Sequence, residues 1–111
     1  MDTLPVFPLN TVIFPGTPLA LHIFEERYRA MVRDCLTDMR PCIVSLIRNG
    51  EKPSALQAEP NLIACTAAIT QMEPLPDGRM NITVVGGARV ELLQLHFDKL
   101  YITATARELP L

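Results

Sequence analysis

The stretches Leu4-Pro-Val-Phe-Pro-Leu9, Phe14-Pro-Gly16 and His22-Ile-Phe-Glu-Glu-Arg-Tyr-Arg29 decide the fold of this chain. Short apolar runs on either side of the Pro-Gly pair predict two β-strands joined by a type II turn, because proline fixes φ at the first central position and glycine supplies positive φ at the second. The two prolines of the first stretch cannot donate to a strand ladder, so we expect that strand to lie at a sheet edge or to be interrupted. The second strand is expected over residues 19–23.

In the third stretch the spacing of the apolar residues changes from that of a strand to that of a helix. Between residues 24 and 39 apolar residues recur at helical spacing and charged residues occupy the other positions, which is typical of an amphipathic helix. We therefore expect one helix over about 24–39, ended by Pro41, with His22 capping its start through hydrogen bonds. The apolar stripe of this helix comprises Tyr28, Met31, Val32, Cys35, Leu36 and Met39.

The rest of the chain reads mainly as strands. Gly86 and Gly87 stand inside a strand pattern, where glycine usually marks a bulge or a bend, and a sheet that curls into a barrel needs such a corner. The polar segment 48–61 is predicted to be a loop. The predicted strands cover residues 42–47, 62–72, 80–85 with a continuation to 95, and 102–107, and Leu75–Arg79 carries an Asp-Gly hairpin signal. The sum is an α+β domain, a bent and mainly antiparallel sheet with one helix packed against it.

Length and composition limit the classes of function that this chain can have. A chain of 111 residues that is 49% hydrophobic is expected to form one domain whose core needs neither disulfides nor metal. The net charge of -2 weighs against nucleic-acid binding, which usually needs a basic excess. Three cysteines without a close pair indicate free thiols in a reducing compartment. Neither a signal-peptide pattern nor an apolar run of about 20 residues occurs, so we expect a cytoplasmic protein with no membrane partner.

No catalytic apparatus is recognisable in the sequence. The serines are Ser45 and Ser54, and the lysines are Lys52 and Lys99. A catalytic Ser–Lys pair needs rigid, desolvated positions, which a polar loop holding Ser54 and Lys52 does not offer. The sequence has no Gly-rich phosphate loop, and three cysteines with two distant histidines do not make a zinc site. We therefore expect a domain that is not an enzyme and that holds no cofactor and no metal.

The opening stretches, together with Leu75-Pro-Asp-Gly-Arg79, Gly86–Arg89 and Tyr101–Ala104, resemble the Lon N-terminal domain family, the substrate-binding domain of ATP-dependent Lon proteases of the protease La type. The likeness departs at Ala64-Cys65, where the family commonly has a glycine. It implies a PUA-like pseudo-barrel of about six strands, forming a single domain over residues 1–111. The helical subdomain usual in the family is not found in these residues, as in an excised fragment or an abbreviated, stand-alone member.

The resemblance implies a non-catalytic module that binds unfolded or degradation-destined polypeptides. A pseudo-barrel whose first strand is broken by prolines leaves an opening where an extended segment can add by backbone pairing. We expect Phe7, Phe14 and the loop from Arg48 to Leu62 to line this opening, although both phenylalanines could equally close the barrel end. Arg27 could present its charge to a bound peptide, but anchoring of the first helical turn is the favoured role.

Two other functions stay open. PUA-like barrels elsewhere bind RNA, and Arg29, Arg33, Arg40 and Arg48 could form a basic strip, although acidic residues beside them reduce its charge. The second alternative is a purely structural role in self-association. A fragment that lacks its helices would leave apolar surface uncovered and would associate through it.

Overall fold

The computed structural model describes residues 2–47 and 62–110, so the predicted loop 48–61 lies outside the described residues. The helix is α1 (Glu26–Asp38), and the strands are β1 (Asp2–Leu9), β2 (Pro18–Ile23), β3 (Cys42–Leu46), β4 (Ile63–Pro74), β5 (Met80–His96) and β6 (Thr103–Glu108). All six strands form one sheet in the order β2-β5-β4-β3-β1-β6. A further pairing of β5 with β6 closes every strand except β2 into a ring.

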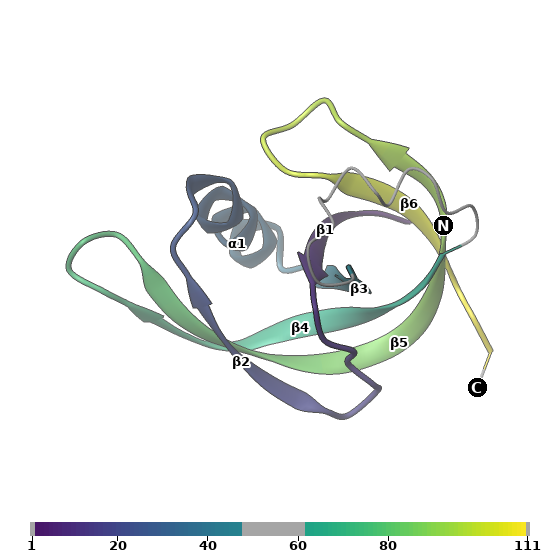
Figure 1. The fold of residues 1–111 in the computed structure, drawn as a ribbon, viewed down its shortest axis with the longest axis horizontal. Helices are drawn as coiled ribbons and strands as arrows, with labels where there is room; N and C mark the ends of the chain where they lie inside the picture. The colour runs from purple at the N-terminus through teal and green to yellow at the C-terminus, as the bar shows by residue number, and fades with distance from the viewer. Residues whose placement is uncertain (1, 48–61, 111) are drawn as a thin grey trace.

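This architecture confirms the predicted α+β pseudo-barrel of mainly antiparallel strands. The β1–β3 pair is parallel, and the other strand pairs of the described residues are antiparallel. Figure 1 shows the sheet curling back on itself, with α1 beside β1 and above β4 and β5. The helix therefore covers one face of the sheet, and the ring of strands encloses the other.

β1 lies inside the sheet and not at its edge, and its ladder on each side is interrupted, which is the second of the two arrangements that its prolines predict. Its first half, which includes Pro5, pairs with β6, and its second half, which includes Pro8, pairs with β3. Each half therefore has one paired side and one side without a ladder, where a residue lacking an N–H is tolerated. β3 and β6 thus each occupy one side of one half of β1.

β5 changes partner at its glycine pair. Before the glycines it pairs with β2, and after them it pairs with β6, while β4 follows it along its other side. Cys65 pairs with Arg89 and Ala67 with Gly86, so two residues of β5 face Thr66 alone. The Thr66 hydroxyl fills the gap by accepting a hydrogen bond from the Ala88 N–H at 2.8 Å. This bulge confirms the predicted corner, and the Ala64-Cys65 departure does not remove it.

The predicted Pro-Gly turn is present and is packed directly on β5. The Thr17 N–H donates to the Phe14 carbonyl at 2.9 Å, and Gly16 has a φ of 83°. The Gly16 N–H donates to the Gly86 carbonyl at 2.8 Å, and the Gly86 N–H donates to the Thr17 carbonyl at 2.9 Å. A Cβ at Gly86 would lie 2.0 Å from the Phe14 carbonyl oxygen. Only glycine allows the two backbone segments to approach this closely.

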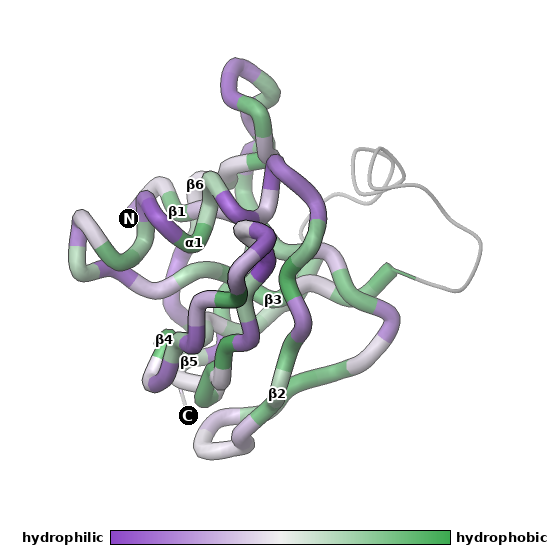
Figure 2. Tube along the Cα trace, turned by 90° about the vertical axis from the view of Figure 1, so that its left-hand side faces the viewer, coloured by the Kyte–Doolittle hydropathy of each residue, from purple (hydrophilic) through white to green (hydrophobic). Residues whose placement is uncertain are grey.

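The core has two parts, one on each side of the barrel wall. Strand alternation divides neighbouring residues between them, so that Val6 belongs to one cluster and Phe7 to the other. In Figure 2 hydrophobic and hydrophilic residues follow one another along much of the chain. The barrel cluster includes Leu4, Val6, Ile43, Val90, Leu92 and Ala104, and the helix-side cluster includes Phe7, Ile23, Met31, Val32, Cys35, Val44 and Val84.

α1 is shorter than the apolar stripe predicted. Phe24 precedes the helix and is exposed, and the helix ends at Asp38, three residues before Pro41. Met39 adopts a left-handed conformation with φ 54°, and its side chain is 90% exposed. Leu36 is also exposed. The buried residues of the helix are therefore Met31, Val32 and Cys35, and the left-handed Met39 ends the helix.

The start of α1 is held differently from the expected His22 cap. His22 lies on β2 and its Nδ1 pairs with the Asn81 side-chain oxygen at 2.8 Å, and no side chain caps the helix at Glu25. Arg27, for which a structural role was favoured, lies at the start of the helix. Its guanidinium donates to the Glu25 carboxylate at 2.8 Å and lies 4.8 Å from the centre of the Tyr28 ring.

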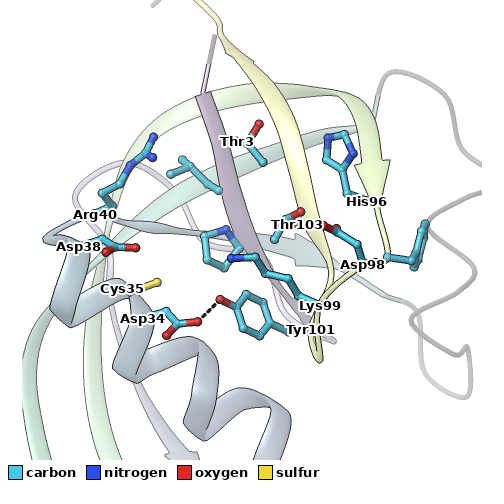
Figure 3. A pocket seen from close by; sticks show the side chains of 13 residues that line it. Thr3, Asp34, Cys35, Asp38, Arg40, His96, Asp98, Lys99, Tyr101 and Thr103 are labelled. Atoms are coloured by element: carbon cyan, nitrogen blue, oxygen red, sulfur yellow. Dashed lines mark hydrogen bonds between the residues drawn. The ribbon is translucent and has the colours of Figure 1, made fainter.

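The connection between β5 and β6 is tied to α1 by Tyr101. The ring is 5% exposed, and its hydroxyl donates a hydrogen bond to the Asp34 carboxylate of the helix (Figure 3). Burial of the phenol, and then its hydrogen bond to the negative carboxylate, raise the pKa of Tyr101 above the ordinary 10.0. The contact therefore favours the protonated phenol in the folded state.

Replacing Gly86 by alanine should lower the free energy of unfolding by about 3 kcal/mol or more, because the new Cβ meets a rigid carbonyl. The matched control is Gly16→Ala in the same turn, where a Cβ meets nothing within 4 Å. That change should cost only about 1–2 kcal/mol, the penalty of left-handed φ. Urea denaturation of both variants measures the difference. Equal losses would contradict the close packing of the turn on β5.

Tyr101→Phe should lower the free energy of unfolding by about 1–2 kcal/mol near neutral pH, because the buried ring loses its hydrogen bond to a charged group. Wild-type stability should also fall as pH rises through 10.0, where the phenol of the unfolded chain ionises before that of the folded one.

Tyr101→Phe lacks this contribution of the tyrosine to the loss of stability at alkaline pH. Both proteins keep the contribution of Cys35 and Cys42, whose pKa values burial raises from 9.0 to about 11 and about 12. The prediction therefore concerns the difference between the two urea-denaturation series across alkaline pH. A difference that stays constant as pH rises would show that the hydroxyl titrates as freely in the folded protein as in the unfolded one.

Candidate functional site

An apolar groove opens where the chain leaves β1 and β3 and enters β4. Its volume is about 210 Å³. The segment after β1, the second half of β3 and the first residues of β4 form its sides, and one residue of β5 lies at its rim. We call this hollow the apolar groove; it is lined by Thr11, Val12, Ile13, Phe14, Val44, Leu46, Leu62, Ile63, Ala64, Cys65 and Arg89.

The floor of the apolar groove is part of the folded core. Val44 and Cys65 are 3% exposed and face each other as a register pair of β3 and β4, and Ile13 is 5% exposed beside them. The core position of the floor follows from strand alternation, since Val44 shares a face of β3 with buried Cys42. A rigid floor of this kind leaves little freedom to be lost when a ligand binds.

The walls, in contrast, are exposed large hydrophobic residues. Val12 is 53% exposed, Phe14 57%, Leu46 44% and Ile63 43%. Single exposed apolar side chains are common on soluble proteins, but a group of them around one hollow is typical of an interaction site. The fold does not need these side chains to be buried, and it holds them together at one place on the surface.

The Pro-Gly turn fixes the position of Phe14 in this group. The carbonyl of Phe14 accepts the hydrogen bond that closes the turn, and the turn is bonded to Gly86 on β5. Phe14 is thus attached to a rigid strand through its backbone while its ring stays open to solvent. The sequence motif that predicts a turn therefore also positions an exposed aromatic residue.

The five residues predicted for binding lie in different places. Phe14 and Leu62 come together in the apolar groove. Phe7 is 7% exposed and stacks on Tyr28 with ring centroids 4.5 Å apart, so it is a core residue and not a binding residue. Arg27 is engaged by Glu25 at the start of α1, away from the groove. Arg48 lies outside the described residues.

Nine of the eleven groove residues were not among the predicted ones. Four of these nine supply the exposed apolar walls and the charge: Val12, Leu46, Ile63 and Arg89. Leu46 and Ile63 lie near the ends of predicted strands, and Val12 lies between two of them. The sequence pattern does not tell a strand end that closes a core from one that stays open. Arg89 follows the glycine pair, whose bulge sets the direction of the residues after it. Only the strand pairing brings these four side chains to the same hollow.

The thiol at the floor is a poor nucleophile. Burial raises the pKa of Cys65, while the Gly87 backbone and the positive charge of Arg89 act against this effect. The sulfur donates to the Thr66 carbonyl at 3.3 Å. Within the described residues no three histidine, cysteine or acidic side chains are grouped so that they could hold a metal ion. Among the described residues the groove lining is therefore mainly apolar, with a weakly nucleophilic thiol at its floor.

A larger polar pocket of about 520 Å³ lies on another side of the molecule, between α1, the start of β1 and the β5–β6 connection (Figure 3). Charged groups of both signs surround it, and several of them are already engaged. Asp34 accepts the Tyr101 hydroxyl, and Arg40 pairs with Asp2 at 3.3 Å. Because charges of both signs surround this pocket, it does not indicate one class of ligand as the apolar groove does.

The basic strip suggested for RNA binding is not continuous in the described residues. Arg40 is paired with Asp2, and the half-buried Arg29 side chain lies below the hairpin turn, 2.9 Å from the site of a Cβ on Gly78. Arg33 is exposed. RNA binding stays a prediction without a supporting surface here. As for membranes, none of the helical residues described forms a span long and apolar enough to cross one.

Comparison with known proteins agrees with the fold and with the sequence motifs. Residues 3–110 match the family profile of the ATP-dependent protease La (LON) substrate-binding domain. The chain is 32% identical to a LON peptidase N-terminal domain and RING finger protein of Schizosaccharomyces pombe, over 88% of this chain and 22% of that protein. It is 25% identical to a Lon protease of Flavobacterium johnsoniae, over 96% of this chain and 13% of that protein.

Solved structures give the same result. The crystal structure of a Lon N-terminal domain protein from Xanthomonas campestris superposes with a TM-score of 0.77 at 25% identity, covering 97% of this chain and 60% of that one. The N-terminal domain of the Lon protease of the Mycobacterium avium complex superposes with a TM-score of 0.71, covering 98% of this chain and 55% of that one. Its identity of 16% supports the fold alone.

The chain spans 22% and 13% of the lengths of the two relatives named first, and the matched part is the substrate-binding domain. The matched domain is the non-catalytic, substrate-binding part of these proteases, in agreement with the prediction of a non-catalytic domain. A role in substrate recognition follows at the level of the family. The match over residues 3–110 places this chain in the Lon substrate-binding domain family.

Proposed function

We propose that this domain binds unfolded or partly folded polypeptides, and that the apolar groove receives an apolar segment of them. The observation that carries this proposal is the group of four large hydrophobic side chains exposed around one preformed hollow. Membership of the Lon substrate-binding domain family supports a recognition role without chemistry. The groove supplies the surface on which such recognition is expected.

A groove of this kind distinguishes unfolded from folded polypeptides by what each exposes. A folded protein hides most of its large apolar side chains, whereas an unfolded chain presents them to water. Transfer of such a side chain from water into the groove is favourable by roughly 1.5–3 kcal/mol. Loss of motional freedom opposes this gain, and so we expect weak, micromolar binding with little dependence on the order of the residues.

Phe14→Ser should weaken binding of an unfolded model polypeptide by about tenfold or more, because an anchoring aromatic residue is lost from the groove wall. The matched control is Phe24→Ser. Phe24 is 59% exposed, close to the 57% of Phe14, but it lies outside the groove lining. Fluorescence titration with a permanently unfolded, reduced and alkylated protein measures both affinities. The control should bind as the wild type does.

Two outcomes would contradict the proposal. One is an absence of binding up to millimolar polypeptide, and the other is an equal effect of both substitutions, which would mean that exposed phenylalanines act without regard to position. Sedimentation equilibrium should accompany the titration, because self-association through the same groove would also depend on Phe14. It would be detected as a dimer that Phe14→Ser abolishes. A monomeric wild type that binds the polypeptide separates the two functions.

A further inference from the structure

Arg89 is the charged residue among the residues that line the apolar groove. It is exposed, and its backbone lies opposite Cys65, which forms part of the groove floor. In the described part of the chain its guanidinium has no ion pair, whereas carboxylates hold four other arginines, Arg27, Arg40, Arg79 and Arg107. Among the described residues that line the groove, Arg89 is thus the one charged side chain, and no described carboxylate holds it, so it is available to a ligand.

The charge of Arg89 acts on the groove itself. The positive guanidinium lowers the pKa of the Cys65 thiol, in opposition to the burial that raises it. An arginine whose side chain reached away into solvent would have little effect on a thiol that is 3% exposed. Its long side chain can also lie along the apolar wall while the charged end stays at the water boundary.

A bound segment would change the surroundings of this charge. Apolar side chains placed on Phe14, Leu46 and Ile63 would exclude water beside the guanidinium and lower the local dielectric. A carboxylate on the segment could then accept two parallel hydrogen bonds from the planar guanidinium, an arrangement that is stronger than a neutral hydrogen bond. A lysine or arginine on the segment would instead meet an uncompensated positive charge.

We propose that the apolar groove selects apolar polypeptide segments that carry a carboxylate, and that Arg89 is the residue that binds this carboxylate. The inference rests on the proposed function and names the substrate class within it. The carboxylate is supplied either by an aspartate or glutamate side chain or by a free C-terminus. Both sources present the same planar, negatively charged group to the guanidinium.

The net charge of the chain makes this preference distinctive. With a formal charge of -2, the protein as a whole attracts basic peptides more than acidic ones. A preference set by overall charge would therefore favour lysine, and a preference set by Arg89 favours a carboxylate. Whether the protein prefers acidic or basic peptides therefore distinguishes a contact with Arg89 from the effect of the overall charge.

The test uses one apolar decapeptide of leucine, phenylalanine and serine residues, blocked at both ends and carrying Asp, Asn or Lys at its first, middle or last position. A further peptide has no charged side chain but a free C-terminal carboxylate. Fluorescence anisotropy gives the dissociation constant of each peptide for the wild type, Arg89→Gln, Arg89→Glu and the control Arg33→Glu. Arg33 is likewise exposed, but it lies on α1 outside the groove lining.

The wild type should bind at least one Asp peptide roughly tenfold more tightly than its Asn counterpart, the size expected of a hydrogen bond to a charged group. Arg89→Gln should bind Asp and Asn peptides equally, and Arg89→Glu should prefer the Lys peptide. The Arg33→Glu control should keep the wild-type order. A gain with the free C-terminus alone, also lost in Arg89→Gln, would identify the terminal carboxylate as the source.

Equal binding of Asp, Asn and Lys peptides by the wild type would overturn the role of Arg89. If Phe14→Ser still weakened all of these peptides, the proposed function would stand and the selectivity would not. A preference for Asp that survives in Arg89→Gln would also overturn the inference. If no peptide bound to any variant, the proposed function itself would fail, and the selectivity would fail with it. Urea denaturation of each variant confirms that the fold is intact.

Discussion

The contact between the Pro-Gly turn and Gly86 is the constraint on which both the barrel and the groove depend. Two backbone hydrogen bonds, from Gly16 to Gly86 and from Gly86 to Thr17, join the turn to β5. The approach is so close that a single methyl group would clash with the Phe14 carbonyl. On one side of this contact β5 passes from β2 to β6 and closes the ring. On the other side the chain presents Phe14 to solvent beside the ends of β3 and β4.

The same contact explains why the groove is open although its floor is core. The turn is bonded to β5 by backbone groups, so the Phe14 ring is not required to fill space beneath it. Val44 and Cys65 are already covered from the helix side, where they belong to the cluster that packs against α1. The exposed walls can therefore change without loss of the core, and the surface is free to serve recognition. In the proposed function, stability and binding therefore depend on different side chains that lie within a few residues of one another in the sequence.

The sequence allowed much of the fold to be predicted, because turn chemistry and periodicity act locally. Pro15 and Gly16 predict a turn, and Gly86 and Gly87 predict a corner, without knowledge of any partner strand. The position of β1 could not be predicted in this way. Pro5 and Pro8 exclude a continuous ladder on both sides, but an edge strand and a strand that exchanges partners at its midpoint satisfy this condition equally well. Only long-range pairing decides between the two.

The candidate site shows the same limit more clearly. Phe7 and Phe14 stand in similar Pro-rich surroundings, yet one is core and the other is a groove wall, because strand parity directs Phe7 toward α1. No local pattern identifies Arg89, since its importance comes from facing Cys65 across a bulged register. A basic residue on an acidic chain would ordinarily be taken as part of a solvated surface. It becomes a candidate for binding carboxylates only when the fold places it at the rim of an apolar hollow, without an ion pair to any described residue. There a bound segment would remove the water that screens its charge.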